Sequence, residues 1–138
     1  MSLYLIKAMI AIALVAAGIA AFASQMALMG RAERKGDPEK LRKFHRRAGR
    51  LFVVLLLPLA FLGAKFWVAA RDSLSIRAGF HVVLALALVT LLLLKVLIVR
   101  VHRGFLRFAP TLGMTVFALT LLAFALSAVF AGLAFISR

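Results

Sequence analysis

Three histidines are the residues of this sequence best suited to chemistry, because the chain has no cysteine and only four acidic residues. His45 and His102 each precede an arginine, and each stands where an apolar stretch meets a charged one. The third, His81, lies near the start of another apolar stretch. Neutral imidazoles ligate metals, and two of them at one level can bind a haem iron from opposite sides. Whether two of these rings can share a ligand depends on the segments that position them.

The composition is that of an integral membrane protein. Of the 138 residues, 65% are hydrophobic, whereas soluble domains contain about 45–50% apolar residues. The 18 Lys and Arg residues give a net charge of +14. Because these cations flank apolar stretches, we expect anionic lipid headgroups at a basic face and no nucleic acid. The absence of cysteine excludes thiolate metal sites and a covalently attached c-type haem.

Four apolar segments are long enough to cross a bilayer and predict four transmembrane helices. The helices are expected over about 3–29, 38–71, 76–106 and 111–136, separated by a basic linker at 30–50 and by Ala-Pro-Thr-Leu-Gly at 109–113. Asp37 and Pro38 are typical of a helix cap and first turn, and Pro58 predicts a kink. The expected fold class is all-α, an integral membrane four-helix bundle in a single domain over 1–138.

The distribution of cations predicts the orientation of the helices. Thirteen of the 18 Lys and Arg residues lie in the 30–50 linker or near the junction of the third and fourth helices. By the positive-inside rule, both connections are cytoplasmic and both termini face the other side. We therefore expect a multi-pass protein of the bacterial cytoplasmic (inner) membrane.

A cleaved signal peptide is the competing interpretation of residues 1–24, because Ala-Phe-Ala-Ser at 21–24 resembles a cleavage site. A signal peptide carries its positive charge before the apolar run, whereas here the cations follow it. The pattern therefore favours a membrane span.

The spacing of His45 and His102 predicts that they lie at one height. The second and third helices form an antiparallel hairpin, and the midpoint between the two histidines falls inside its bend near 71–75. Each histidine is about 28 residues from that bend, and each helical residue adds about 1.5 Å. Both would therefore lie just beyond the apolar stretch on the cytoplasmic side. This is the arrangement of a b-type haem with two axial histidines.

Neighbouring residues agree with a haem. Gly49 follows His45 by four residues, hence on the same helical face, where a glycine lets a macrocycle approach the backbone. Lys95 precedes His102 by seven residues and would share its face of the predicted helix. Cations at this level could bind the propionates or a quinone headgroup. They are Arg46, Arg50, Lys95, Arg100 and Arg103.

The same residues allow a simpler interpretation. Cations gather at the cytoplasmic ends of membrane helices, and histidines there need no ligand. The chain would then be a cofactor-free accessory or scaffold subunit that uses its basic face to bind a larger membrane complex. A third interpretation is a haem-handling or oxidase-assembly factor that binds haem transiently.

Two segments resemble known membrane proteins. HRRAGRLFVVLLLPLAFLG at 45–63 resembles the ligand helices of small four-helix membrane b-type cytochromes, among them the ascorbate-dependent transmembrane b-type cytochromes and the ferric-reductase-like proteins. VHRGFLRFAPTLG at 101–113 is similar to a boundary in uncharacterised bacterial four-helix membrane families. The resemblance covers about 40–115. It implies one haem b held by His45 and His102, with electron transfer as the task.

His81 marks a departure from the ascorbate-dependent family, which binds two haems with two histidine pairs. The position opposite His81 across the hairpin is Phe66, so a second haem would need Met9 or a histidine from another subunit. We expect His81 to be a hydrogen-bonded interior residue, with a second haem or a quinol site as the alternative. With one haem, electrons would pass to a quinone or to another membrane redox subunit.

The absence of acidic residues from the apolar segments excludes several other functions. No carboxylate in a span could act as a general base, and proton- or cation-coupled transporters usually bury one near mid-bilayer. No phosphate-binding or dinucleotide motif appears. Beside these exclusions, the resemblance implies an electron-transfer protein, which as an enzyme would be an oxidoreductase component.

Overall fold

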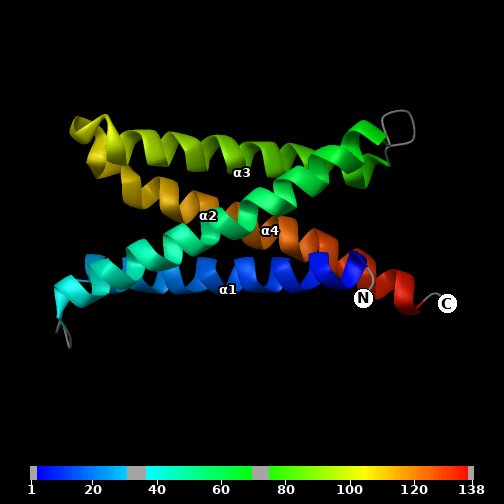
Figure 1. Ribbon diagram of the computed structural model, residues 1–138, viewed down its shortest axis with the longest axis horizontal. Coiled ribbons are helices and arrows are strands. Elements are labelled where there is room, and N and C mark those ends of the chain that lie inside the picture. Colours follow the sequence, from blue (N-terminus) through cyan, green and yellow to red (C-terminus); the bar gives the residue numbers. More distant parts are fainter. Residues whose placement is uncertain (1–2, 31–36, 70–74, 137–138) are drawn as a thin grey trace. The chain divides into compact units, whose positions relative to one another are not determined.

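The structure is a computed structural model that describes residues 3–30, 37–69 and 75–136, without the side chains of residues 3, 4, 103 and 129–136. All regular secondary structure in these ranges is helical, which confirms the all-α prediction. In chain order (Figure 1) the elements are α1 (Leu3–Met29), α2 (Pro38–Ala69), α3 (Ile76–Arg100), the 3-10 helix η1 (Arg103–Phe108) and α4 (Ala109–Ile136).

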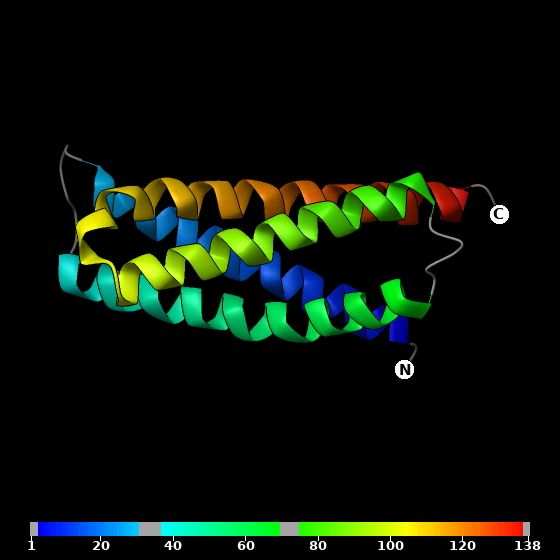
Figure 2. The same cartoon turned by 90° about the horizontal axis from the view of Figure 1, so that it is seen from above.

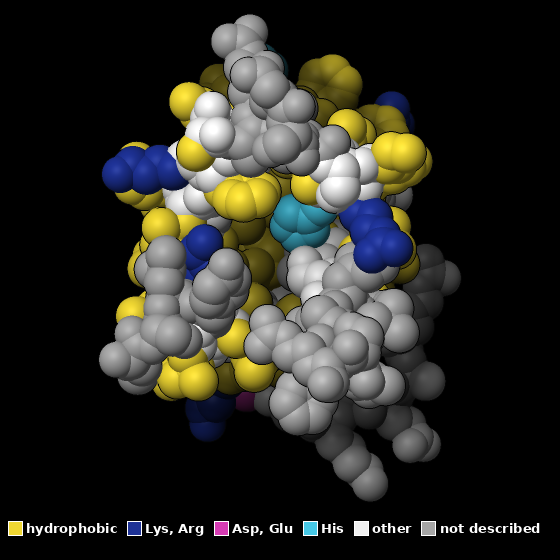
Figure 3. All heavy atoms as spheres, turned by 90° about the vertical axis from the view of Figure 1, so that its right-hand side faces the viewer, with side chains coloured by type: hydrophobic (Ala, Val, Ile, Leu, Met, Phe, Trp, Pro, Cys, Tyr) yellow, Lys and Arg dark blue, Asp and Glu magenta, His cyan; other side chains and the backbone are white. Residues whose placement is uncertain are grey.

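The helices are long and apolar enough to cross a membrane four times. The candidate spans are Leu5–Met29, Pro38–Ala69, Ile76–Arg100 and Gly104–Ala128. Large hydrophobic side chains are exposed on every span, and hydrophobic side chains predominate among the described residues in the view of Figure 3. Such exposure suits a lipid environment and would be costly in water. The four spans indicate a multi-pass membrane protein.

The chain divides into two compact units, Met1–Phe61 and Leu62–Arg138. The first contains α1 and most of α2, and the second contains the end of α2 together with α3, η1 and α4. Helix α2 continues through Pro58, three residues before this boundary. Pro58 has no N–H for the carbonyl of Val54, so the backbone bond at this turn is lost. The kink and the single domain stay predictions.

In the first unit, α1 and α2 meet where His45 contacts Ala21 and Ser24. Leu14, Ala17 and Ser24 are buried on α1, and Ala48 and Phe52 are buried on α2. Small side chains allow close approach of two membrane helices. The start of α2 is the one predicted, because Asp37 Oδ1 accepts a hydrogen bond from the Glu39 N–H at 2.9 Å. This bond satisfies one of the free N–H groups at the helix start.

In the second unit, α3 and α4 are antiparallel helices joined by η1 (Figures 1 and 2). Their contacts share one register. The Nζ atom of Lys95 lies over Gly113, and His81 contacts Ser127. In each pair the two residue numbers average 104, so both pairs are placed symmetrically about the same point of the connection. The same centre relates Leu88 to Thr120, which are both buried near the middle of their helices.

The end of α3 differs from the prediction, which continued this helix to about residue 106. Helix α3 ends at Arg100, because the backbone of His102 leaves the helical region with φ −107° and ψ 69°. The N–H groups of Val101 and His102 both point to the Leu97 carbonyl, at 2.8 and 3.4 Å. The predicted separator at 109–113 is the first part of α4, whose first turn accepts Pro110 without losing a bond.

Candidate histidine site

His45 of α2 is bound to the backbone and a side chain of α1. Its Nδ1 atom lies 2.9 Å from the Ala21 carbonyl oxygen and 3.0 Å from Ser24 Oγ. The Ser24 hydroxyl donates its own proton to the same carbonyl at 2.8 Å. A carbonyl oxygen only accepts, so the close contact with His45 requires the proton to be on Nδ1. In the neutral ring, Nε2 is then the nitrogen with a lone pair.

This tautomer is the one that metal-ligating histidines adopt. In such histidines the N–H of the second ring nitrogen usually donates a hydrogen bond to a carboxylate, a backbone carbonyl or water, which orients the ring and raises its basicity. In His45 the backbone carbonyl of Ala21 has that role, and Ser24 adds a second acceptor. These contacts orient the ring through its Nδ1 atom.

The helical period of α2 explains why His45 faces α1. Leu41, His45, Ala48 and Phe52 recur at spacings of three and four residues and lie on one face of the helix. Ala48 and Phe52 are 7% and 5% exposed, and His45 is half-buried. Ser24 is 4% exposed, so its hydroxyl needs internal partners. The carbonyl of Ala21 and the His45 ring supply them.

Gly49 lies one turn from His45 on nearly the same face, as predicted. A Cβ atom placed on Gly49 would meet no atom within 4 Å among the residues that the structure describes. The glycine therefore leaves open space beside His45, into which a flat ligand could pack. Arg46 and Arg50 are exposed, and they project from α2 about 100° and 140° around the helix from His45.

His102 stands at the break between α3 and η1. Its carbonyl accepts a hydrogen bond from the Phe105 N–H at 3.0 Å, and its side chain makes no capping bond to η1. The side chain is exposed. Arg100 is exposed in the last turn of α3, where a cation interacts favourably with the helix dipole. The Arg103 side chain lies outside the described residues.

Lys95 is half-buried and extends along α4. A Cβ atom at Gly113 would lie 2.6 Å from Lys95 Nζ, so the glycine makes the room that the ammonium group occupies. The predicted face shared by Lys95 and His102 is wrong, because α3 ends at Arg100 and helical periodicity does not extend to His102. Lys95 is thus a residue of the α3–α4 contact.

His81 is hydrogen-bonded, as predicted, and its interior position in a bundle stays a prediction. Its Nδ1 atom lies 3.4 Å from Ser127 Oγ, a long hydrogen bond between α3 and α4. The Ser127 hydroxyl also donates to the Ala123 carbonyl at 3.0 Å. Both side chains are exposed in the described part of the chain. The contact gives the His81 ring a partner on α4.

The two predicted ligands belong to different units, so their pairing stays a prediction of the sequence. Within the described ranges, no group of three or more His, Cys, Asp and Glu side chains could hold a metal ion. A haem makes a smaller demand on the protein, because the porphyrin supplies four nitrogens and the chain adds two.

Sequence reasoning missed Ser24 and Gly113, although the register argument could have found both. The midpoint of Ser24 and His45 falls within the linker between α1 and α2, just as the midpoint of Lys95 and Gly113 falls within η1. Applying the argument to every consecutive helix pair would have placed Ser24 at the height of His45 and Gly113 at the height of Lys95.

The described residues form four helices that could each span a membrane, and a histidine of α2 is hydrogen-bonded to α1. These features are typical of multi-pass α-helical membrane proteins. Within this class, the chain belongs to a family of unknown function, DUF6529, whose model matches residues 1–134. Comparison with the curated proteins gives no match. Comparison with the solved structures likewise gives none.

Proposed function

We propose that this protein is a membrane electron-transfer protein that holds one b-type haem near the cytoplasmic face, with His45 and His102 as axial ligands. The helices would form a four-helix bundle in the bacterial inner membrane, with both termini outside. Electrons would be exchanged with a quinone or with a partner redox subunit. The protein would then be an oxidoreductase component with no substrate chemistry of its own.

The observation that carries the proposal is the anchoring of the His45 ring, whose Nδ1 atom lies within 3.0 Å of two α1 atoms. The Ala21 carbonyl and Ser24 accept the Nδ1 proton and so orient the ring from the α1 side. Histidines on membrane helices whose only task is to face headgroups need no such orientation. Here the ring is fixed by two partners on α1, and Gly49 leaves open space on its side of α2.

His102 is proposed as the second ligand on the basis of the sequence. Its distance along the chain from the α2–α3 connection equals that of His45, so antiparallel helices would carry both to one height. Arg100 and Arg103 adjoin His102 and are proposed as propionate contacts.

A haem with two axial histidines accepts and releases one electron without opening a coordination position to substrate. The role of the chain would be to orient both rings, to neutralise the propionates and to exclude water with the apolar side chains of α2 and α3. Lys95 is proposed as a contact for a quinone headgroup, since it is a half-buried cation within a span.

The reduced-minus-oxidised visible spectrum of the protein purified in mild detergent tests the proposal, with haem quantified as its pyridine complex. We expect the bands of a low-spin b-type haem. We also expect about one haem per chain, because one pair of histidines holds one haem. A colourless protein from cells supplied with haem would contradict the proposal and favour a cofactor-free accessory subunit. Haem far below one per chain would favour a haem-handling or oxidase-assembly factor.

A further inference from the structure

We propose that the first turns of α2 bind anionic phospholipid headgroups through an exposed cationic surface, whether or not the protein binds haem. We call this surface the basic face. It consists of Lys40, Arg42, Lys43, Arg46, Arg47 and Arg50, whose side chains are all exposed.

The helical period separates the basic face from the face that packs on α1. With about 100° per residue, the six cations cover about 160° of the helix circumference. Their centre lies roughly opposite the face formed by Leu41, His45, Ala48 and Phe52. The contact of His45 with Ala21 therefore turns the cations away from α1. They point to the surroundings of the protein.

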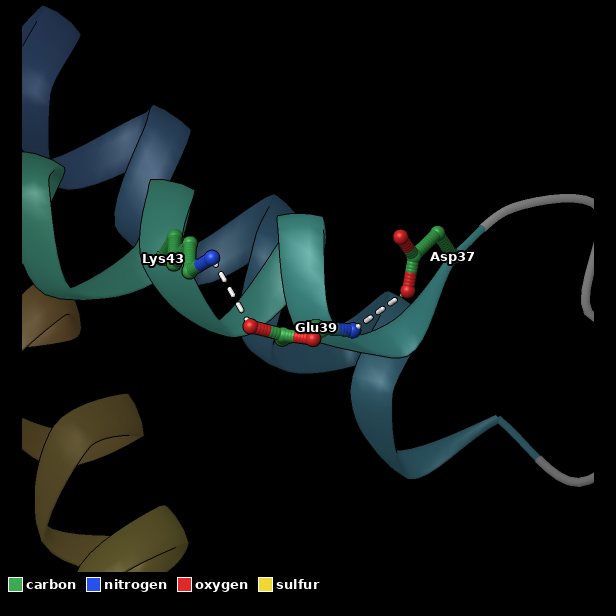
Figure 4. Close-up of polar contacts among 3 residues, drawn as sticks. All are labelled: Asp37, Glu39 and Lys43. Atoms are coloured by element: carbon green, nitrogen blue, oxygen red, sulfur yellow. Dashed lines mark hydrogen bonds and ion pairs between the residues drawn. The ribbon is translucent and has the colours of Figure 1, made fainter.

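The basic face has far too few anions of its own. Lys43 forms an ion pair with Glu39 at 2.8 Å (Figure 4). Asp37 is engaged at the helix start, where it accepts the Glu39 N–H. Among the described residues, no acidic side chain lies within ion-pair distance of the arginines of this face. Arg42, Arg46 and Arg50 are spaced by four residues, so like charges stack along the helix and destabilise it. External anions would remove that repulsion.

The depth of the basic face fits phospholipid phosphates. Arg50 immediately precedes Leu51, where the apolar part of α2 begins. The three arginines at 42, 46 and 50 rise over about 12 Å, and each headgroup region is roughly 5–8 Å thick. Arg50 and Arg46 would therefore lie among the phosphates, with Arg42 at their outer edge. Arginine binds phosphate oxygens in pairs, which makes these contacts strong.

The occupant that these observations favour is an anionic lipid. The basic face continues directly into a lipid-facing surface, since Leu51, Val54 and Leu57 are 52%, 62% and 64% exposed. A phospholipid matches both parts at once, with its phosphate on the arginines and its acyl chains on the apolar residues. An acidic protein would match only the first.

The test uses the full-length protein in phosphatidylcholine vesicles that contain a trace of spin-labelled lipid. The relative association of labelled phosphatidylglycerol and phosphatidylcholine is measured for the native protein and for two triple variants. The first replaces Arg42→Gln, Arg46→Gln and Arg50→Gln. The charge-matched control replaces Lys7→Gln, Lys65→Gln and Arg77→Gln on the other helix ends. A third variant with Arg→Lys at 42, 46 and 50 keeps the charge.

We expect the native protein to prefer phosphatidylglycerol over phosphatidylcholine on the order of fivefold. This is the effect expected of about one cation near an anionic membrane surface. The Arg→Gln triple should lose most of this preference, whereas the control and the Arg→Lys triple keep most of it. High salt should weaken the preference by screening. Equal association of both lipids with the native protein would overturn the proposal, and so would an equal loss in the control. Because the readout is lipid selectivity, absence of haem leaves this test unaffected.

Discussion

Ser24 Oγ of α1 lies 3.0 Å from His45 Nδ1 of α2, and both atoms contact the carbonyl oxygen of Ala21. This triangle joins the two helices of the first unit through one polar contact in an apolar setting. It also determines which ring nitrogen of His45 carries the proton. His45 joins α2 to α1 and is also a proposed haem ligand, and both roles depend on the same hydrogen bonds. Mutations can test the two roles separately.

Replacing Ser24 should weaken the α1–α2 contact modestly. Interhelical hydrogen bonds in membrane proteins average about 0.6 kcal/mol, and in Ser24→Ala the Ala21 carbonyl would still accept from His45. We expect Ser24→Ala, His45→Ala and the double variant to give a coupling free energy of about that size. Unfolding in mixed micelles measures it. Ser75→Ala, at the start of α3, should show no coupling to His45→Ala, and strictly additive effects of Ser24→Ala would count against the contact.

The proposed haem ligands make a sharper prediction. His45→Ala and His102→Ala should each abolish the low-spin haem spectrum, because iron would lose one of its two protein ligands. His81→Ala is the matched control and should retain the haem, since the partner of His81 is Ser127. A normal haem content in either ligand variant would refute the assignment, and loss of haem in His81→Ala would bring His81 into the ligand set.

Gly113→Ala tests the contact of Lys95 with α4. The added Cβ would lie 2.6 Å from Lys95 Nζ, so the ammonium group must move aside. In a Lys95→Ala background that obstacle is absent, and the alanine should stabilise the helix by about 0.5–1 kcal/mol. In the native background we expect a smaller gain or a loss. Thermal unfolding of the native protein, the two single variants and the double variant gives the effect of Gly113→Ala in each background. An equal effect of Gly113→Ala in both backgrounds would contradict the contact.

The start of α2 offers two substitutions of different expected cost (Figure 4). Asp37→Ala removes a helix cap and should cost about 0.5–2 kcal/mol of local helix stability. Glu39→Gln removes an ion pair whose side chains are 64% and 73% exposed, and such pairs contribute only about 0–0.5 kcal/mol. Amide hydrogen exchange at residues 39–41 should therefore accelerate more in Asp37→Ala. The reverse order would show that the ion pair, and not the cap, holds this helix start.

The absence of native cysteine makes the proposed orientation easy to test. Single-cysteine variants Lys40→Cys and Asp72→Cys would be exposed to a membrane-impermeant maleimide on intact spheroplasts. We expect labelling of Asp72→Cys alone, and of Lys40→Cys only after permeabilisation, because cation-rich connections stay in the cytoplasm. The opposite pattern would place the termini in the cytoplasm and reverse the proposed sidedness.

The register of the helix hairpins was accessible from the sequence, but the shape of the connections was not. Equal distances from a bend place residues at one height, and Lys95 lies over Gly113 in that way. The same reasoning did not foresee that α3 stops at Arg100 and that η1 follows. Nothing in the composition of 101–108 forbids a helix, and the break is visible only in the backbone angles of His102.

The sequence by itself determined four membrane-length helices, because long apolar runs without carboxylates have no other stable arrangement in lipid. It also determined the start of α2, since Asp37 and Pro38 act locally. Only the tertiary structure decided the state of His45. A proton position depends on which acceptors lie within about 3 Å of the ring, and both come from a helix about 20 residues earlier in the chain. Spacing can place two helices at one height, but the rotation of each helix decides which atoms meet.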